Sequence, residues 1–141
     1  MGSLLVIKDK SKKSFNNEYI LGETIIEGCR TLRFKNCHFI SKLLMSNCGN
    51  LWFEDCTFYE EVVAVGILDA DFVHNVMVKK FSVYNSNMVD IYGNRFWDPD
   101  WVLSGLADSR IVSNFLSTEG IPPRPPTIKI MKSMKKRYRN R

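Results

Sequence analysis

Apolar and polar positions along the chain recur in an order that repeats about every 19 residues. The segment CRTLRFKNCHF begins at Cys29, and CGNLWFEDCTF, which begins at Cys48, has its apolar, aromatic, cysteine and phenylalanine residues at the same places. Weaker copies begin at Ile67, Ser86 and Leu106, so the successive offsets are 19, 19, 19 and 20 residues. Aligned copies at nearly constant spacing predict a solenoid in which each copy forms one coil.

Three positions define the register of this repeat. The first is apolar, the second comes three residues later and is Cys or Asn, and the third comes two residues after that and is apolar again. In chain order the first set is Phe34, Phe53, Phe72, Ile91 and Ile111, the second is Cys37, Cys56, Asn75, Asn94 and Asn114, and the third is Phe39, Phe58, Met77, Phe96 and Leu116. A weaker copy around Phe15 precedes them. One coil cannot bury its inner face alone, so the apolar positions predict a core shared by stacked coils.

The segments between the copies read KLLMSN, EEVVAVGI and KKFSVYNS. They are short, rich in β-branched or aromatic residues and bounded by polar residues, which favours strands over helices. We therefore predict an all-β chain with two strands per coil, a parallel β-helix of 19–20-residue coils. The alternative is a leucine-rich-repeat-like solenoid, although that class uses about 20–29 residues per repeat and a helix or similar return segment.

The segments CGNLWFEDCTF and SNMVDIYGNRF resemble coils of the right-handed parallel β-helix family, which includes pectate-lyase-like and phage tailspike-like folds. The resemblance covers residues 29–117. It implies a right-handed coil with inward residues stacked on one another, and an asparagine ladder of side-chain hydrogen bonds at one corner. Asn75, Asn94 and Asn114 match the ladder position, whereas Cys37 and Cys56 depart from it and are expected to stack there as small apolar side chains.

The chain divides into three predicted parts. Residues 1–28 form an N-terminal cap and first coil, with Leu4 to Ile7 capping the end of the stack. Residues 29–120 form the β-helix, with residues 97–105, WDPDWVLSG, predicted as an aromatic-rich insertion. Residues 121–141 form a Pro-rich spacer and a basic tail. Residues 124–141 hold eight Lys or Arg and no acid, while residues 1–123 hold twelve basic and fifteen acidic residues, a net charge of −3.

Candidate chemistry lies on the outward side of the repeated strand. Alternation makes Trp52 point outward if Leu51 and Phe53 point inward, and the equivalent positions are Arg33, Asp71, Asp90 and Arg110. Asp71 and Asp90 are expected on adjacent coils, where two carboxylates could act as in retaining glycosidases, with Trp52 stacking on a sugar and Arg110 holding a carboxylate. The favoured interpretation is a solvated face of mixed charge, in which Arg110 offsets the paired acids, so no catalytic residue is predicted and these three are only candidates.

Cysteines and histidines add no further chemistry. The four cysteines, Cys29, Cys37, Cys48 and Cys56, contain no C-x-x-C pair, so we predict buried thiols, no metal site and no cofactor. His38 and His74 lie next to the ladder position without a partner for a triad, which predicts turn or surface histidines. The chain lacks a P-loop and a dinucleotide fingerprint.

The basic tail is predicted to reach a partner because a stiff Pro-rich spacer holds it away from the body. Its binding candidates are Lys132, Lys135, Lys136, Arg137, Tyr138, Arg139 and Arg141, and Trp52, Trp97 and Trp101 are the candidates on the body. The tail could bind an acidic protein surface or nucleic acid, or only aid solubility.

Together these features favour a non-enzymatic structural or assembly protein of a virus or phage particle, a homo-oligomer or part of a larger protein assembly. The alternatives are a carbohydrate-binding or polysaccharide-cleaving β-helix protein and a nucleic-acid-binding protein. No membrane segment or signal peptide is predicted, so the expected location is the virion or, for a non-viral protein, the cytoplasm.

Overall fold

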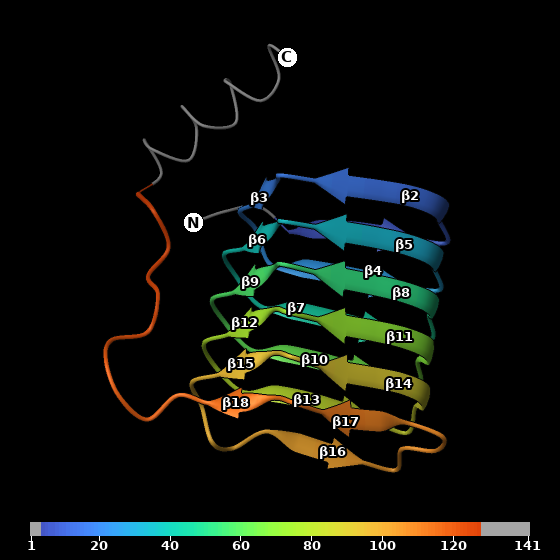
Figure 1. Ribbon diagram of the computed structural model, residues 1–141. Coiled ribbons are helices and arrows are strands. Elements are labelled where there is room, and N and C mark those ends of the chain that lie inside the picture. The colour runs from blue at the N-terminus through green and yellow to red at the C-terminus, as the bar shows by residue number, and fades with distance from the viewer. Residues whose placement is uncertain (1–3, 128–141) are drawn as a thin grey trace.

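The protein is a stack of flat coils that wind around one shared core (Figure 1). The computed structural model describes residues 4–127. Within these residues the chain forms eighteen strands and no helix. The strands lie in three parallel sheets of six strands each. In Figure 1 the front strands run leftward while the chain descends, which is the right-handed sense of a coil.

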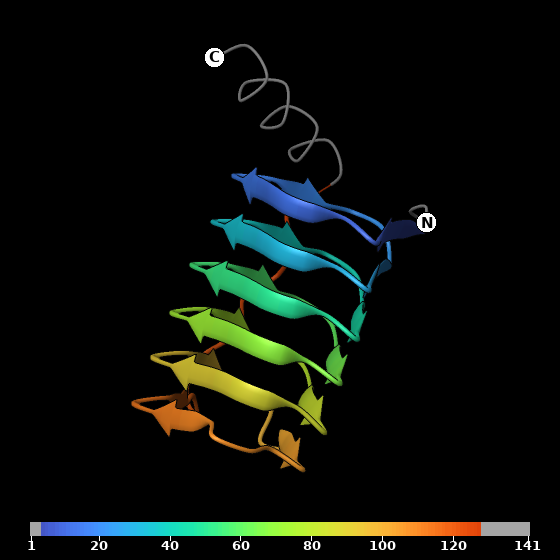
Figure 2. The same cartoon turned by 90° about the vertical axis from the view of Figure 1, so that its right-hand side faces the viewer.

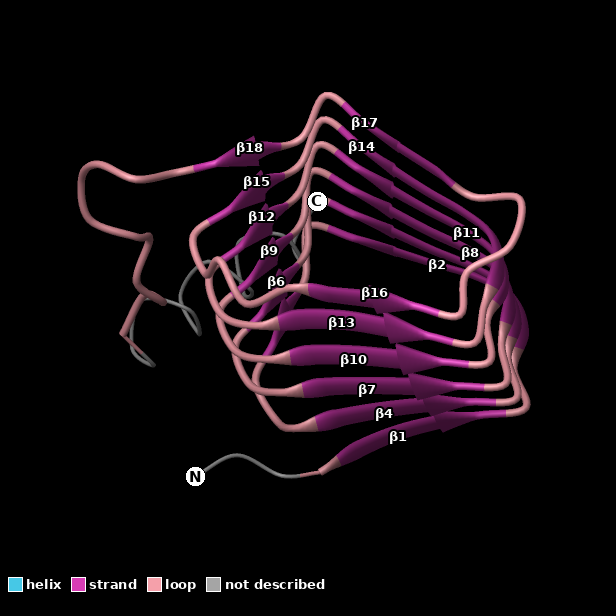
Figure 3. Ribbon diagram, turned by 90° about the horizontal axis from the view of Figure 1, so that it is seen from below, coloured by secondary structure: helices cyan, strands magenta, loops and turns pink. Residues whose placement is uncertain are grey.

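Each of the six coils contributes one strand to each sheet, as the end-on view in Figure 3 shows. Sheet A holds β1 (Leu5–Lys8), β4 (Thr24–Glu27), β7 (Leu43–Ser46), β10 (Val62–Val65), β13 (Phe81–Tyr84) and β16 (Val102–Ser104). Sheet B holds β2 (Ser11–Asn16), β5 (Arg30–Lys35), β8 (Gly49–Glu54), β11 (Leu68–Val73), β14 (Asn87–Tyr92) and β17 (Arg110–Val112). Sheet C holds β3 (Tyr19–Ile20), β6 (His38–Phe39), β9 (Thr57–Phe58), β12 (Val76–Met77), β15 (Arg95–Phe96) and β18 (Phe115–Leu116).

The predicted all-β solenoid of 19–20-residue coils is confirmed, and the leucine-rich-repeat alternative is wrong because no helix lies on the return side of any described coil. The expectation of two strands per coil was also wrong, because each coil has three. The third strand is only two residues long, so in the sequence it reads as a continuation of the strand before it. The weak first copy is confirmed, since Phe15 pairs in register with Phe34.

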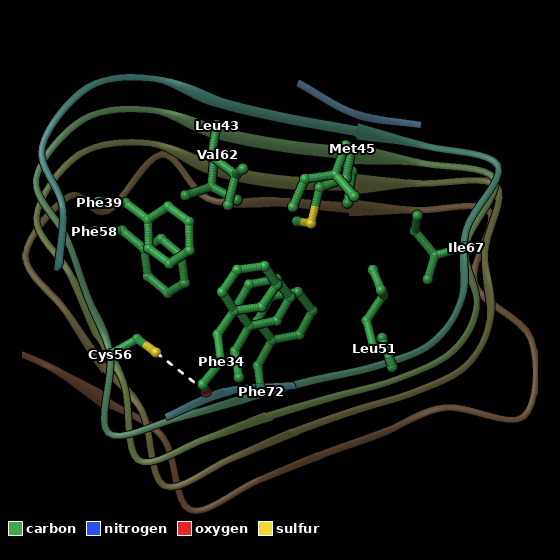
Figure 4. Packing of buried hydrophobic residues seen from close by; sticks show 14 of the residues in the cluster. Phe34, Phe39, Leu43, Met45, Leu51, Cys56, Phe58, Val62, Ile67 and Phe72 are labelled. Carbon is green, nitrogen blue, oxygen red and sulfur yellow. Dashed lines mark hydrogen bonds between the residues drawn. The ribbon is translucent and has the colours of Figure 1, made fainter. Parts of the chain in front are cut away.

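The core consists of columns of identical or similar side chains. Phe15, Phe34, Phe53 and Phe72 stack with ring centroids 4.7, 4.9 and 5.1 Å apart and with nearly parallel planes. Phe39 and Phe58 form a second column beside them, at a centroid distance of 5.0 Å. Figure 4 shows these rings filling the space between the sheets. The distance between stacked rings nearly equals the spacing of adjacent strands in a sheet. Coils that pair in register therefore also bring equivalent rings into offset-stacked contact.

A polar ladder runs along the corner between sheets B and C. The Asn75 Nδ2 donates to the Phe53 carbonyl at 2.9 Å, and its Oδ1 accepts from the backbone N–H of Cys56 at 2.8 Å. Asn94 and Asn114 repeat the bond to the carbonyls of Phe72 and Ile91. The predicted asparagine ladder is therefore confirmed.

Cysteine continues this ladder toward the N-terminus. The Sγ atoms of Cys37 and Cys56 donate to the carbonyls of Phe15 and Phe34, both at 3.3 Å, in the place of the asparagine amide. All four cysteines are buried and free, as predicted. The thiols are thus weak hydrogen-bond donors in the ladder as well as small apolar side chains.

The corners require left-handed backbone. At the corner before the ladder, φ is positive at Asn36, Asp55, His74 and Gly93, between 53° and 67°. Asn, Asp and Gly accept this conformation at least cost, so the polar residues that interrupt the hydrophobic pattern are corner residues.

The prediction of an insertion at residues 97–105 was wrong. Val102–Ser104 form β16, which pairs with β13 in sheet A, so this segment is an ordinary return strand in a coil one residue longer than the others. At the other end, Leu5–Lys8 form β1, the first strand of sheet A, where Leu4 to Ile7 were expected to cap the stack. The three-part division of the chain at residues 28 and 120 stays a prediction.

Candidate functional site

The first candidate site is the outward column on sheet B. Arg33 pairs in register with Trp52, Trp52 with Asp71, Asp71 with Asp90, and Asp90 with Arg110. The structure therefore brings these five residues together in the predicted order. The local reason is strict alternation: in β8 the residues Gly49, Leu51 and Phe53 are buried, while the residues between them face outward.

Two neighbouring carboxyl groups in this column lie in different surroundings. Arg110 binds Asp90 with two nitrogens, Nη2 to Oδ2 at 3.1 Å and Nε to Oδ1 at 3.4 Å. Burial, and then the nearby charge of Asp90, raise the pKa of Asp71. Together with Val73, Tyr92 and Val112, these three charged residues line a surface hollow of about 380 Å³. The hollow thus has two carboxyl groups, one guanidinium and apolar walls.

Trp52 has partners within the protein. The Arg33 guanidinium lies 5.3 Å from the centroid of its ring, within the range of a cation–π contact. Its Nε1–H donates to Glu54 Oε1 at 3.1 Å. A second hollow beside it is lined by Lys12, Lys13 and Thr31, among others, and is therefore basic. The role of Trp52 in sugar stacking stays a prediction.

Trp97 and Trp101 lie elsewhere, on the segment that leads into the last strand of sheet A. Trp101 stacks on Phe96 with the ring centroids 5.1 Å apart and so continues the core toward the C-terminal end. The Trp97 Nε1 is buried and has no hydrogen-bond partner in the described part of the chain. These two rings do not join Trp52 in one site, since Trp52 belongs to sheet B.

His38 differs from the expected turn or surface histidine. It lies in β6, stacked between Tyr19 and Tyr59 at centroid distances of 4.6 and 5.9 Å, with its Nδ1 3.0 Å from the Tyr59 hydroxyl. Burial lowers the pKa of His38. Alternation alone could not show this, because Tyr59 comes from the segment after the next short strand. His74 is a corner residue, as expected.

The second candidate site is the last coil. Four of its inward residues, Leu103, Leu106, Ile111 and Leu116, form what we call the C-terminal end face, and Ser109 holds the inward position after Val89. Ile111 and Leu116 are 45% and 47% exposed, whereas Ile91 and Phe96, which precede them in the same columns, are 0% and 2% exposed. Val112 and Phe115 on the outer side of this coil are exposed as well. Strands β16, β17 and β18 each end a sheet and pair on one side only.

The described chain after β18 leaves this end face open. In Figure 1 the segment leaves β18 and rises along the side of the stack, away from the last coil, and Figure 2 shows the last coil at the bottom of the stack. Sequence reasoning did not single out Ile111 and Leu116 as surface residues. The signal that could have found them is that the repeat stops after Leu116 without a polar copy to close it.

The remaining predictions concern residues or groups that the structure does not assign. The tail candidates Lys132, Lys135, Lys136, Arg137, Tyr138, Arg139 and Arg141 lie outside the described residues. Among residues 4–127 there is no group of three or more His, Cys, Asp or Glu that could hold a metal ion. The same part of the chain contains no helix with the length and apolar character that a membrane crossing requires. In comparisons with known proteins, no family model and no curated protein matched this chain.

Proposed function

We propose that this protein is a non-enzymatic structural module that assembles with copies of itself through the C-terminal end face. The observation that carries the proposal is the exposure of Ile111 and Leu116 at positions that the four coils before the last one bury. A solenoid needs a polar cap at each end to remain a soluble monomer. Here the last coil presents apolar side chains and unpaired strand edges at the same surface.

A particle component fits this arrangement. The coil pattern is similar to the tailspike-like branch of the β-helix family, and a short rod with one adhesive end is a suitable unit of a virus or phage particle. This part of the proposal rests on fold similarity. The basic tail would then reach a neighbouring surface, which stays a prediction because its residues lie outside the described part of the chain.

The test is the solution mass of the full chain by light scattering over a wide range of concentrations. We expect assemblies heavier than the 16.3 kDa of one chain. Leu116→Lys should shift them toward monomers, while Leu68→Lys, at a residue that is also half-exposed but lies in the middle of sheet B, should not. A monomer at every concentration, or assemblies that both variants leave intact, would contradict the proposal.

A second candidate function, carbohydrate binding or cleavage, has one specific observation in its favour. Asp71 has a raised pKa while its neighbour Asp90 is ion-paired with Arg110, and carboxyl groups in such unlike surroundings can share acid and base roles. The test is release of new reducing ends from a panel of polysaccharides. Asp71→Asn should abolish a measured cleavage, and Asp69→Asn, two residues earlier in β11, should not.

A further inference from the structure

We propose that the C-terminal end face binds the same face of a second copy, which gives a closed dimer with two-fold symmetry. The inference rests on the proposed function, since it names the partner and the geometry of assembly through that end. Three features of the chain support it: the edges of the last coil, the contrast between the two ends of the stack, and the charges beside Ile111.

The edges of the last coil can pair with themselves. Sheets A and B face each other across the core (Figure 3), and β16 and β17 are their last strands. A two-fold axis that crosses β16 near its middle and passes Ser109, just before the start of β17, sets each strand antiparallel to its own copy. Antiparallel edges can form a continuous hydrogen-bonded ladder, and an interface that repeats the same patch on both subunits is the usual form of a soluble dimer.

The N-terminal end does not suit the C-terminal end face. In the inward column where successive coils have Leu32, Leu51, Ala70 and Val89, the first coil has Lys13. Lys12 and Lys13 are exposed there. A head-to-tail stack would place the ammonium group of Lys13 at the inward position next to Ser109, which follows Val89 in this column and supplies no partner charge, and burial of an unpaired ammonium group is costly. An inward-pointing charge on an edge strand is a common device against such pairing.

The charges on the last coil complement each other under the two-fold operation. Asp108 and Arg110 flank Ser109, and both are exposed. If antiparallel copies of this segment pair around Ser109, Asp108 of each copy faces Arg110 of the other. The side chain of Arg110 is 79% exposed while it contacts Asp90, so its guanidinium keeps donors for a second carboxylate.

The test uses the full chain and two charge variants. Wild type should have a limiting mass twice that of one chain. Asp108→Lys would place Lys opposite Arg110 in the dimer, and Arg110→Asp would place Asp opposite Asp108, so each variant alone should be monomeric. Their equimolar mixture should dimerise again, because one copy then carries both positive and the other both negative charges. Lysine is suited to position 108 because Lys12, at the equivalent place in the first coil, has a similar positive φ, 55° against 48° for Asp108.

The size of the end-face contribution can be checked in the same experiment. Leu116→Lys changes two side chains per dimer and should raise the dissociation constant by about thirtyfold or more, from lost apolar burial alone. Circular dichroism of each variant shows whether the coils remain folded.

The outcomes separate this inference from the proposed function. Recovery of the dimer in the mixture supports both. Assemblies that grow beyond two copies with concentration and still depend on Leu116 would overturn the two-fold dimer and leave the proposed function standing. A dimer unaffected by either charge variant would also overturn the pairing around Ser109. A monomer under all conditions would overturn both.

Discussion

Replacement of Asn75 tests how the corner ladder holds adjacent coils together. Asn75→Ala removes the acceptor of the Cys56 N–H and the donor to the Phe53 carbonyl, both of which are buried with the ladder. A buried polar group left without a partner costs about 1–3 kcal/mol. Two such groups and a small void give an expected loss of about 3–5 kcal/mol in the free energy of unfolding, a large part of the ~5–15 kcal/mol of a typical domain.

The chain itself supplies the informative second variant. Asn75→Cys places at this corner the residue found at Cys37 and Cys56, whose thiols reach the equivalent carbonyls. A thiol is a weaker donor, so we expect a loss of about 1–2 kcal/mol rather than the full cost of Asn75→Ala. Asn16→Ala, at an exposed position of β2, is the control and should change stability by less than about 0.5 kcal/mol.

The assay is urea unfolding followed by circular dichroism and tryptophan fluorescence. The reasoning is refuted if Asn75→Ala costs no more than Asn16→Ala, since the ladder would then contribute nothing. It is also refuted if the alanine and cysteine variants lose the same free energy of unfolding, because the hydrogen bonds donated by the thiols of the ladder would then contribute nothing to stability.

Individual side chains give four further predictions. Met88 is half-exposed at a φ of +58°, so Met88→Asn should raise the free energy of unfolding by about 0.5–1 kcal/mol in urea titrations, while Met88→Leu should not. The raised pKa of Asp71 means that stability falls as pH rises through that pKa; Asp71→Asn should therefore unfold at a higher temperature than wild type at pH 7, and the difference should vanish near pH 3. Burial lowers the pKa of His38 in the folded protein. The resulting contribution to stability is present above the ordinary pKa of about 6.5 and is lost as pH falls through the pKa of the folded state. The melting temperature of His38→Phe should therefore depend less on pH in that acidic range than the melting temperature of wild type. The hydrogen bond to Cys37 and burial raise the pKa of Cys56, so a thiol reagent should modify it only at the rate of unfolding, and fast reaction in the native state would contradict its burial.

The fold was largely predictable because the repeat is explicit in the sequence. The columns through Phe34, Cys37 and Phe39 appear as a fixed period, and stacking in register is a consequence of it. The third strand was missed because a two-residue strand has too few positions to show alternation. Asn36 and Asp55 are corner residues, but in a single sequence a polar residue with positive φ cannot be distinguished from an ordinary polar surface residue.

The candidate site was predictable only in part. Register placed Asp71 beside Asp90, and the structure agrees. The contact of Arg33 with Trp52, and the stack of His38 with Tyr59, depend on side-chain directions between coils that spacing does not determine. The exposure of Leu116 depends on the path of the chain after β18. The hydrophobic pattern alone suggested that Leu116 is itself a core residue.

The constant register of the coils also gives the protein a simple way to change its length. A tandem duplication of any 19 residues in the middle of the stack, such as 48–66, would supply one whole coil with its own ladder residue, corner residues and phenylalanines. The rod would lengthen by the spacing of one strand, about 4.8 Å, and both ends would remain unchanged. Its length is therefore a modular property that genetic duplication can adjust one coil at a time.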